Sequence, residues 1–294
     1  MSHFTRRSLH LTATACACAL LAACAQTATA PAQTPPPPKP APVGEVKGTA
    51  AQHTAASAAD VTQRAAVVLP ASVTGGAPYV GTLANAPKVT QGKAPVVVFL
   101  HGSSGLGLKA IGEWQLYLAS LGVASIAPDS FALPGRITYT SPVGKDVYEK
   151  IHALRASEIP LALQALRAAP WADTTRLVLA GTSEGGPAVA RHVGNEFAGR
   201  MLYSWSCEDN YFVQNHRTAA LTQPVLNVMS LTDVYFSPSN PWLGNSAAKG
   251  YCADALKDNK QAMIVLIPGA PHTLLNLPAA RHATASFVRD VLKP

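Results

Sequence analysis

The chain has 294 residues, 48% of them hydrophobic and 13% charged, so it is too apolar to be disordered throughout and a packed core is expected. The formal net charge is +7, but its Lys and Arg residues are scattered without a basic run that could follow a phosphate backbone, which argues against a nucleic-acid partner. Outside the N-terminus no apolar run reaches 18 residues, which excludes a membrane protein with several spans.

Residues 1–23 have the pattern of a secretory signal peptide. Arg6 and Arg7 form its positive segment, and an apolar stretch follows up to Ala23. The end of this stretch, Leu-Ala-Ala before Cys24, resembles the lipobox of bacterial lipoproteins. The resemblance implies cleavage before Cys24 and a lipid on its thiol. An ordinary signal peptide with a chance Cys is the alternative, and both Sec and twin-arginine export fit the segment.

The compartment follows from the same resemblance. Ala25 stands after Cys24 where an Asp would resemble an inner-membrane retention signal, so we expect a lipid anchor in the bacterial outer membrane, with the domain in the periplasm or at the cell surface. Two thiols then remain, Cys207 and Cys252. In an oxidising periplasm we expect them to form a disulfide; two separate buried thiols are the alternative.

Residues 24–61 consist largely of Ala, Thr, Pro and Gln, with four consecutive prolines from Pro35. Such a segment buries too little apolar surface to offset the entropy lost on ordering, so we expect a disordered tether. The folded domain is then predicted to span residues 62–294.

Short apolar runs alternate with helical patterns along this domain. Strands are predicted at 96–100, 123–127, 177–180, 201–205, 225–231 and 263–267, with weaker signals at 67–69 and 79–80. Helices are predicted at 106–121, 146–168, 184–193 and 279–292, the second of them bent or broken at Pro160. This alternation predicts an α/β fold with a mostly parallel sheet and helices on both faces. Sites in such sheets form at the carboxyl ends of the strands.

The segment Gly181-Thr182-Ser183-Glu184-Gly185-Gly186 follows one of these strands and opens a helix. It fits the G-x-S-x-G pattern, in which a tight turn lifts a Ser hydroxyl out of the sheet as a nucleophile. An ordinary Gly-rich turn is the alternative. After the 96–100 strand, the loop from His101 to Gly105 can offer a backbone N–H to an oxyanion. We expect the amides of Ser103 and Glu184 to form that oxyanion hole, and His101 to brace the loop.

A Ser hydroxyl needs a base, and the base needs an orienting carboxylate. His272 follows the last predicted strand and is the favoured base, with His216 a weaker candidate. Asp233 directly follows the 225–231 strand and is the favoured acid, with Glu208 and Asp209 as alternatives. The order Ser183, Asp233, His272 is the order used by α/β-hydrolases.

Together these motifs resemble the α/β-hydrolase superfamily over roughly residues 65–294, and more narrowly its dienelactone hydrolase-like branch. Pro128-Asp129-Ser130-Phe131 and Pro271-His272 add to the likeness. True dienelactone hydrolases carry a Cys nucleophile where this chain has Ser183, so the resemblance implies a serine esterase acting on small or medium carboxylic esters, with no cofactor and no metal.

Two other functions stay open at this stage: an amidase or peptidase of the same fold, and a non-catalytic, lipid-anchored binding module. A halide- or epoxide-opening relative would need an Asp where Ser183 stands. The loops at 129–145 and 234–250 are expected to shape the pocket, and Tyr203, Trp205 and Phe236 are candidates to line it. The substrate partner, acyl preference and oligomeric state are not determined by these patterns.

Overall fold

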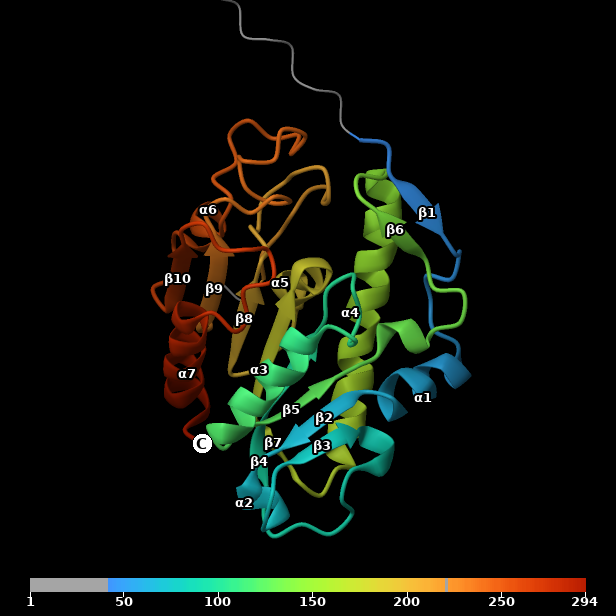
Figure 1. Cartoon of the computed structure of the whole chain (residues 1–294), viewed down its shortest axis with the longest axis vertical. Coiled ribbons are helices and arrows are strands. Elements are labelled where there is room, and N and C mark those ends of the chain that lie inside the picture. The colour runs from blue at the N-terminus through green and yellow to red at the C-terminus, as the bar shows by residue number, and fades with distance from the viewer. Residues whose placement is uncertain (1–41, 220–221) are drawn as a thin grey trace, which may run out of the picture. The chain divides into compact units, whose positions relative to one another are not determined.

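The computed structural model describes residues 42–219 and 222–294, and its centre is an eight-stranded sheet of order β10-β9-β8-β7-β4-β5-β2-β3 (Figure 1). The strands are β2 (Ala66–Leu69), β3 (Tyr79–Thr82), β4 (Ala94–Leu100), β5 (Ala124–Ala127), β7 (Ala172–Thr182), β8 (Gly199–Tyr203), β9 (Val225–Ser230) and β10 (Ala262–Ile267). Strands β10 to β5 in this order pair in parallel, whereas β2 is antiparallel to both β5 and β3. The predicted α/β architecture is confirmed.

Helices cover both faces of the sheet. They are α1 (Ala55–Gln63), α2 (Ala71–Thr74), α3 (Lys109–Ser120), α4 (Lys145–Arg167), α5 (Gly186–Arg191), α6 (Ala253–Leu256) and α7 (Pro278–Leu292), with 3-10 turns η1 (Leu83–Asn85), η2 (Ser130–Ala132) and η3 (Ser183–Gly185). Outside the sheet, β1 (Glu45–Lys47) pairs antiparallel with β6 (Thr138–Thr140). Among the described residues, no helix is long and apolar enough to cross a membrane.

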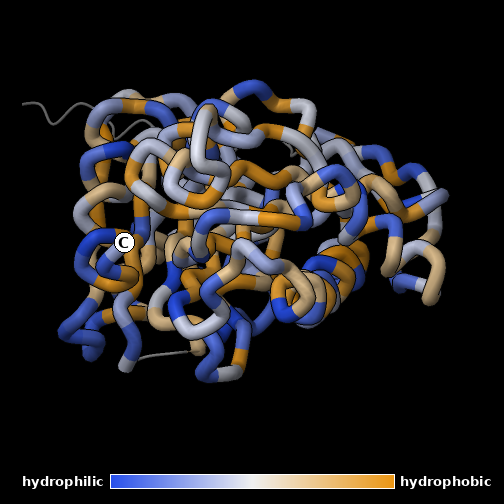
Figure 2. The backbone as a smooth tube through the Cα atoms, turned by 90° about the horizontal axis from the view of Figure 1, so that it is seen from below, coloured by the Kyte–Doolittle hydropathy of each residue, from blue (hydrophilic) through white to orange (hydrophobic). Residues whose placement is uncertain are grey.

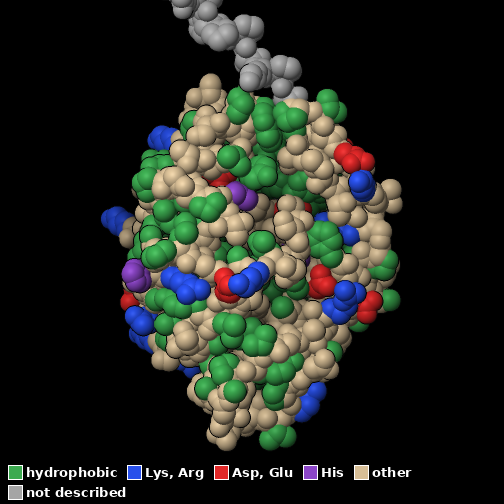
Figure 3. Space-filling model, in the orientation of Figure 1, with side chains coloured by type: hydrophobic (Ala, Val, Ile, Leu, Met, Phe, Trp, Pro, Cys, Tyr) green, Lys and Arg blue, Asp and Glu red, His purple; other side chains and the backbone are tan. Residues whose placement is uncertain are grey.

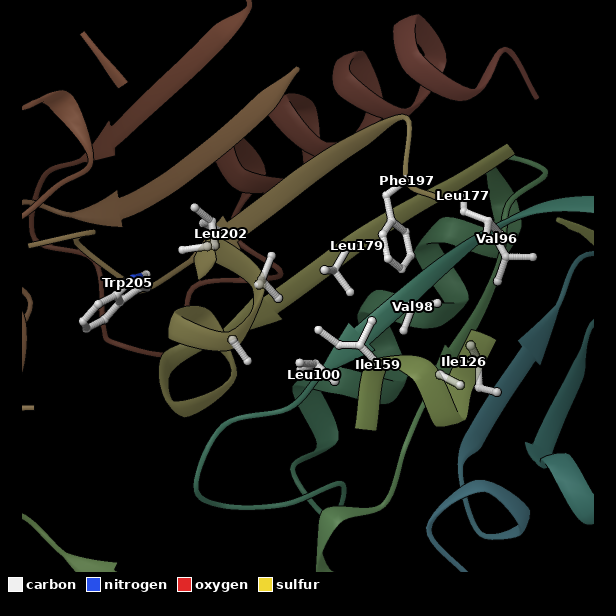
Figure 4. Packing of buried hydrophobic residues seen from close by; sticks show 14 of the residues in the cluster. Val96, Val98, Leu100, Ile126, Ile159, Leu177, Leu179, Phe197, Leu202 and Trp205 are labelled. Atoms are coloured by element: carbon white, nitrogen blue, oxygen red, sulfur yellow. The ribbon is translucent and has the colours of Figure 1, made fainter. Parts of the chain in front are cut away.

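The alternation of side chains along β4 explains the two layers of core. All seven residues of β4 are buried. Val96, Val98 and Leu100 pack toward α4 and α5, together with Ile159 of α4 (Figure 4). Phe99 points to the opposite face, where its ring lies 4.8 Å from that of Trp114 in α3. Because neither face meets water, the strand is apolar at every position. Figure 2 shows hydrophobic segments concentrated toward the middle of the molecule.

Helix α4 contains Pro160, where we expected a bend or a break. The helix is not broken there and runs from Lys145 to Arg167. Proline in a helix interior costs about 3 kcal/mol. The side chains of Ile159, Ala162 and Leu166 around it are fully buried against the sheet, and this burial offsets the lost hydrogen bond.

The expected boundary between tether and domain is too late. Residues 24–41 lie outside the described part of the chain, but residues 42–61 contain β1 and most of α1. Thr54 caps α1 in a reciprocal capping box with Ser57, and Val61 is fully buried. The sequence signal is weak because part of this segment is held by backbone hydrogen bonds to distant residues, such as Ile137 N–H to the Ala50 carbonyl at 2.9 Å.

The predicted disulfide is confirmed. Cys207, in the segment after β8, is bonded to Cys252 at the start of α6, with the two Cα atoms 4.8 Å apart. Both residues are buried. The two cysteines are 45 residues apart and lie on either side of strand β9 along the chain. The bond therefore restrains the described part of the irregular segment between β8 and β9.

Replacing both Cys207 and Cys252 by Ala is expected to lower the free energy of unfolding by about 2–4 kcal/mol, because an unfolded chain without the cross-link gains loop entropy. Denaturant unfolding under oxidising conditions measures the difference. A reducing agent should destabilise the wild type and leave the double variant unchanged. Equal stability of the two proteins would contradict a stabilising role for the bond.

Candidate active site

Ser183 lies at a strained turn between β7 and α5. Its φ is +51°, in the left-handed region that residues other than Gly rarely adopt. The glycines of the motif are needed because the turn is packed tightly: a Cβ at Gly185 would lie 2.3 Å from the Leu100 carbonyl oxygen, and one at Gly181 would lie 2.7 Å from Cγ2 of Val189. The turn therefore has the form of the nucleophile elbow, with its Ser at the carboxyl end of the sheet.

The structure brings the three residues selected from sequence into one hydrogen-bonded chain. His272 Nε2 lies 2.9 Å from Ser183 Oγ, and His272 Nδ1 lies 2.7 Å from Asp233 Oδ2. Asp233 is an acceptor when ionised, so Nδ1 carries the proton and Nε2 is free to accept the Ser183 hydroxyl proton. The arrangement has the geometry required of a nucleophile, a base and an orienting group.

Asp233 is buried, yet it is held in its ionised form. Burial by itself would raise the pKa of this carboxyl, but the hydrogen bond and charge of His272 and two backbone N–H groups outweigh burial, and the pKa lies below its ordinary value. The two N–H groups belong to Tyr235 and Phe236, and both donate to Oδ1 at 2.9 Å. The carboxylate thus keeps Oδ2 for His272.

Two serines that sequence reasoning missed hold the loop that carries His272. Ser204 Oγ donates to the His272 carbonyl at 2.5 Å, and Ser230 Oγ donates to the Ala270 carbonyl at 2.6 Å. Ser204 follows β8 and Ser230 ends β9, so the loop after β10 is tied down at the ends of the two strands that it crosses to reach β7. The sequence signal for this anchoring is a Ser placed directly at the end of a strand.

The loop after β4 lies against the nucleophile, as an oxyanion loop must. A Cβ at Gly102 would lie 3.3 Å from Ser183 Cβ, and Ser103 lines the same cavity as Ser183. The N–H of Glu184 lies in the first turn of η3, where backbone N–H groups have no intrahelical acceptor. The assignment of the Ser103 and Glu184 amides to an oxyanion hole stays a prediction.

Beneath the elbow lies a buried network of two arginines and two glutamates. Glu184 Oε1 accepts from Arg136 at 2.5 Å and lies 3.8 Å from Arg155 Nε, while Arg155 Nη1 lies 3.0 Å from Glu158 Oε2. All four side chains are buried, and their charges cancel. The sequence signal was Arg155 and Glu158, two charges three residues apart on the apolar face of a predicted helix.

His101 belongs to this network and not to the base chemistry. Its Nδ1–H donates to the Gly102 carbonyl at 2.7 Å, and its Nε2 accepts from Ser130 N–H and from Arg155, each at 3.2 Å. Burial first, and then the positive charge of Arg155, hold the pKa of His101 well below its ordinary value. A neutral His101 therefore braces the loop after β4, as the sequence suggested.

The alternative base and acids lie elsewhere. His216 Nε2 is 2.9 Å from Thr218 Oγ1. Glu208 accepts from the backbone N–H groups of Lys249 and Gly250, and Asp209 accepts from the His216 N–H. All of these contacts fix the loops around the disulfide, and none of them involves His272.

A cavity of about 400 Å³ opens beside Ser183 and His272. Phe236 lines it as expected, whereas Tyr203 and Trp205 are fully buried in the core. Both expected loops contribute, and the segment after β8 adds Tyr211 and Phe212, which the sequence analysis missed. Among the described residues no cluster of three His, Cys, Asp or Glu side chains is placed to hold a metal ion.

Comparisons with known proteins give likeness of fold alone. No family model and no curated protein matches the chain. One similar solved structure is Est1E from Butyrivibrio proteoclasticus, with 17% identity over 71% of this chain and 92% of that chain and a TM-score of 0.46. A second is a dienelactone hydrolase-like promiscuous phosphotriesterase from metagenomic libraries, with 18% identity over 68% of this chain and 87% of that chain and a TM-score of 0.49. A third is the dienelactone hydrolase from Anabaena variabilis, with 18% identity over 70% of this chain and 94% of that chain and a TM-score of 0.43.

The class of the fold follows from this chain's own geometry. A mostly parallel eight-stranded sheet carries a strained Ser between a strand and a helix, and an acid and a His follow later strands in that order. These features define the α/β-hydrolase fold that the sequence motifs indicate.

Replacing Arg136 by Met is expected to lower the free energy of unfolding by about 3–5 kcal/mol, since the Glu184 carboxylate stays buried without its nearest cation. The double variant Arg136→Met/Glu184→Gln removes both charges and leaves Arg155 paired with Glu158. Its loss should be clearly smaller than the sum of the two single losses. Denaturant unfolding of the wild type, Arg136→Met, Glu184→Gln and the double variant gives the double-mutant cycle. Additive losses of unfolding free energy would show that the two side chains are not coupled.

Proposed function

We propose that this protein is a serine hydrolase that cleaves carboxylic esters of small or medium size through an acyl-enzyme. The observation that carries the proposal is the hydrogen-bonded chain Ser183–His272–Asp233 at the edge of the cavity. Ser183 is also the one residue of the three in a strained backbone conformation, as a nucleophile lifted out of the sheet requires.

In the first half of the reaction, Ser183 Oγ attacks the ester carbonyl carbon while His272 Nε2 takes the hydroxyl proton. Asp233 stabilises the imidazolium that forms and keeps the ring in the required tautomer. The carbonyl oxygen becomes an oxyanion, which the N–H groups of Ser103 and Glu184 are proposed to bind. One such donor is typically worth about 2.7–4 kcal/mol of transition-state stabilisation.

In the second half, the C–O bond to the alcohol breaks, and His272 delivers its proton to the leaving oxygen. Water then attacks the acyl carbon, His272 takes the water proton, and the acid leaves as Ser183 regains its hydrogen. The ion pair between Arg136 and Glu184 supports this cycle. Arg136 holds the side chain of Glu184, and the backbone N–H of Glu184 is one proposed donor to the oxyanion.

Ser183→Ala is expected to abolish turnover of 4-nitrophenyl acetate while the circular dichroism spectrum and unfolding midpoint stay near those of the wild type. A fluorophosphonate probe should label the wild type at Ser183, located by peptide mapping, and should not label the variant. Wild-type-like turnover in Ser183→Ala, or labelling at another residue, would refute the assignment. A parallel panel of short esters and peptide amides separates an esterase from an amidase.

We propose further that the enzyme is exported and anchored through a lipid on Cys24. Residues 1–24 lie outside the described part of the chain, so the proposal rests on the signal-peptide and lipobox resemblance. The disulfide supports it, because structural disulfides persist in oxidising compartments such as the periplasm.

Expression in a bacterial host with a radiolabelled fatty acid tests the anchor. The wild type should take up label and sediment with outer membranes, whereas Cys24→Ala should take up none. A Cys207→Ala variant controls for loss of any cysteine. Labelling of the Cys24→Ala protein would contradict the proposal.

A further inference from the structure

We propose that the cavity beside Ser183 selects uncharged esters in which the enclosed group is an aromatic ring, and discriminates against esters whose enclosed group bears a carboxylate. The inference rests on the proposed ester hydrolysis and adds the substrate class. It follows from the composition of the cavity wall, its charge and its volume.

One wall of the cavity is a continuous series of aromatic rings that begins at the base. The ring of Tyr235 lies 4.7 Å from His272. Phe236 comes next, with its ring 5.2 Å from that of Phe212 and 6.1 Å from that of Tyr211, nearly parallel to the latter. The segment after β9 supplies Tyr235 and Phe236, and the segment after β8 supplies Tyr211 and Phe212, so the wall is a property of the tertiary fold.

The wall continues away from the catalytic residues to Tyr139 of β6, whose ring lies 6.1 Å from that of Phe212. Aliphatic side chains line the cavity as well, namely Leu108, Ile111 and Leu275. An aromatic group against this wall gains edge and face contacts with its rings beyond the effect of area burial, which a saturated ring of the same size does not.

The lining carries no charged side chain among the described residues. Arg136 is buried nearby, but each of its three nitrogens already donates within the protein: Nε to Ser130 Oγ at 2.8 Å, Nη1 to the Ile137 carbonyl at 2.9 Å, and Nη2 to the Glu184 carboxylate. A carboxylate that entered the cavity would thus lose water and find no cation, while the Asp233 charge lies behind His272. Such burial is costly.

The polar groups that face the cavity are neutral. Burial raises the pKa of both Tyr139 and Tyr211, so their phenols stay protonated at physiological pH. Ser103, Ser104 and Ser141 add hydroxyls. Hydroxyls can donate to the oxygens of a substrate, but they supply no positive charge to offset the lost hydration of a carboxylate. Figure 3 shows hydrophobic and uncharged side chains over most of the upper half of the face that it draws, with Lys, Arg, Asp and Glu side chains there mainly toward the edges.

The volume limits the enclosed group. At the ~30 Å³ that one water-sized group occupies, a cavity of about 400 Å³ holds on the order of a dozen non-hydrogen atoms. A phenylpropanoyl group is of this size, and a larger ester must extend through the mouth of the cavity.

The experiment compares kcat/KM for three matched ethyl esters at pH 7.5: 3-phenylpropanoate, 3-cyclohexylpropanoate and 3-(4-carboxyphenyl)propanoate. The acetates of 2-phenylethanol and its cyclohexyl and 4-carboxyphenyl analogues test the alcohol side. In at least one series we expect kcat/KM for the phenyl ester to be about threefold to tenfold higher than for the cyclohexyl ester. In the same series we expect it to be higher than for the carboxyphenyl ester by about a hundredfold or more.

The variants locate the effect. Thr140 is exposed and lines the cavity, so Thr140→Arg supplies a cation there and should raise the carboxyphenyl-to-phenyl ratio at least tenfold. Thr140→Gln, of similar length and uncharged, should leave this ratio near that of the wild type. Tyr235→Leu, at a partly exposed position, should reduce the phenyl-to-cyclohexyl ratio.

The outcomes separate the two proposals. Ester hydrolysis with phenyl-to-cyclohexyl and phenyl-to-carboxyphenyl ratios of kcat/KM near one, or with a preference for the carboxyphenyl esters, would overturn the substrate class. Either result would leave the proposed ester hydrolysis unaffected. An equal rise of the ratio in Thr140→Arg and Thr140→Gln would also overturn the charge argument. Failure to hydrolyse any ester, combined with no labelling of Ser183 by a fluorophosphonate, would overturn the proposed function and the substrate class with it.

Discussion

The alignment of His272 between Asp233 and Ser183 depends on how the loop after β10 crosses the sheet edge. Asp233 follows β9 and Ser183 follows β7, and β8 lies between these strands, so an imidazole arriving from β10 must pass over two strand ends. Ser230 and Ser204 bind the carbonyls of this loop at those two ends. Backbone anchoring of the loop thus accompanies the 2.9 Å contact between His272 and Ser183.

The buried charges beneath the elbow have two consequences for the site. They tie the turn that follows Ser183 to helix α4 and to the loop after β4, because Arg155 of α4 contacts both Glu184 and His101. Among the described residues, both arginines beneath the elbow, Arg136 and Arg155, are paired with internal carboxylates. The same ion pairs thus connect the elbow to its surroundings and neutralise the two guanidinium groups nearest to it.

Local patterns predicted most of the fold and the three central residues of the site. Fully buried strands such as β4 give continuous apolar runs, and the elbow requires glycines where neighbouring atoms leave no room for a side chain. The anchoring Ser204, the Arg136–Glu184 pair and the aromatic side chains after β8 were missed. Their partners lie dozens of residues away along the chain, and no local periodicity encodes such contacts.

The sequence by itself determined the main strands and helices and the position of the elbow, because each depends on residue type and near neighbours. It made a bond between Cys207 and Cys252 the expected outcome, and the tertiary structure brought the two residues together. The tertiary structure decided where residues 42–61 pack, how α4 continues through Pro160, and which groups surround the nucleophile. Those outcomes depend on burial and on hydrogen bonds between distant segments, which exist only once the sheet has brought its strand ends together.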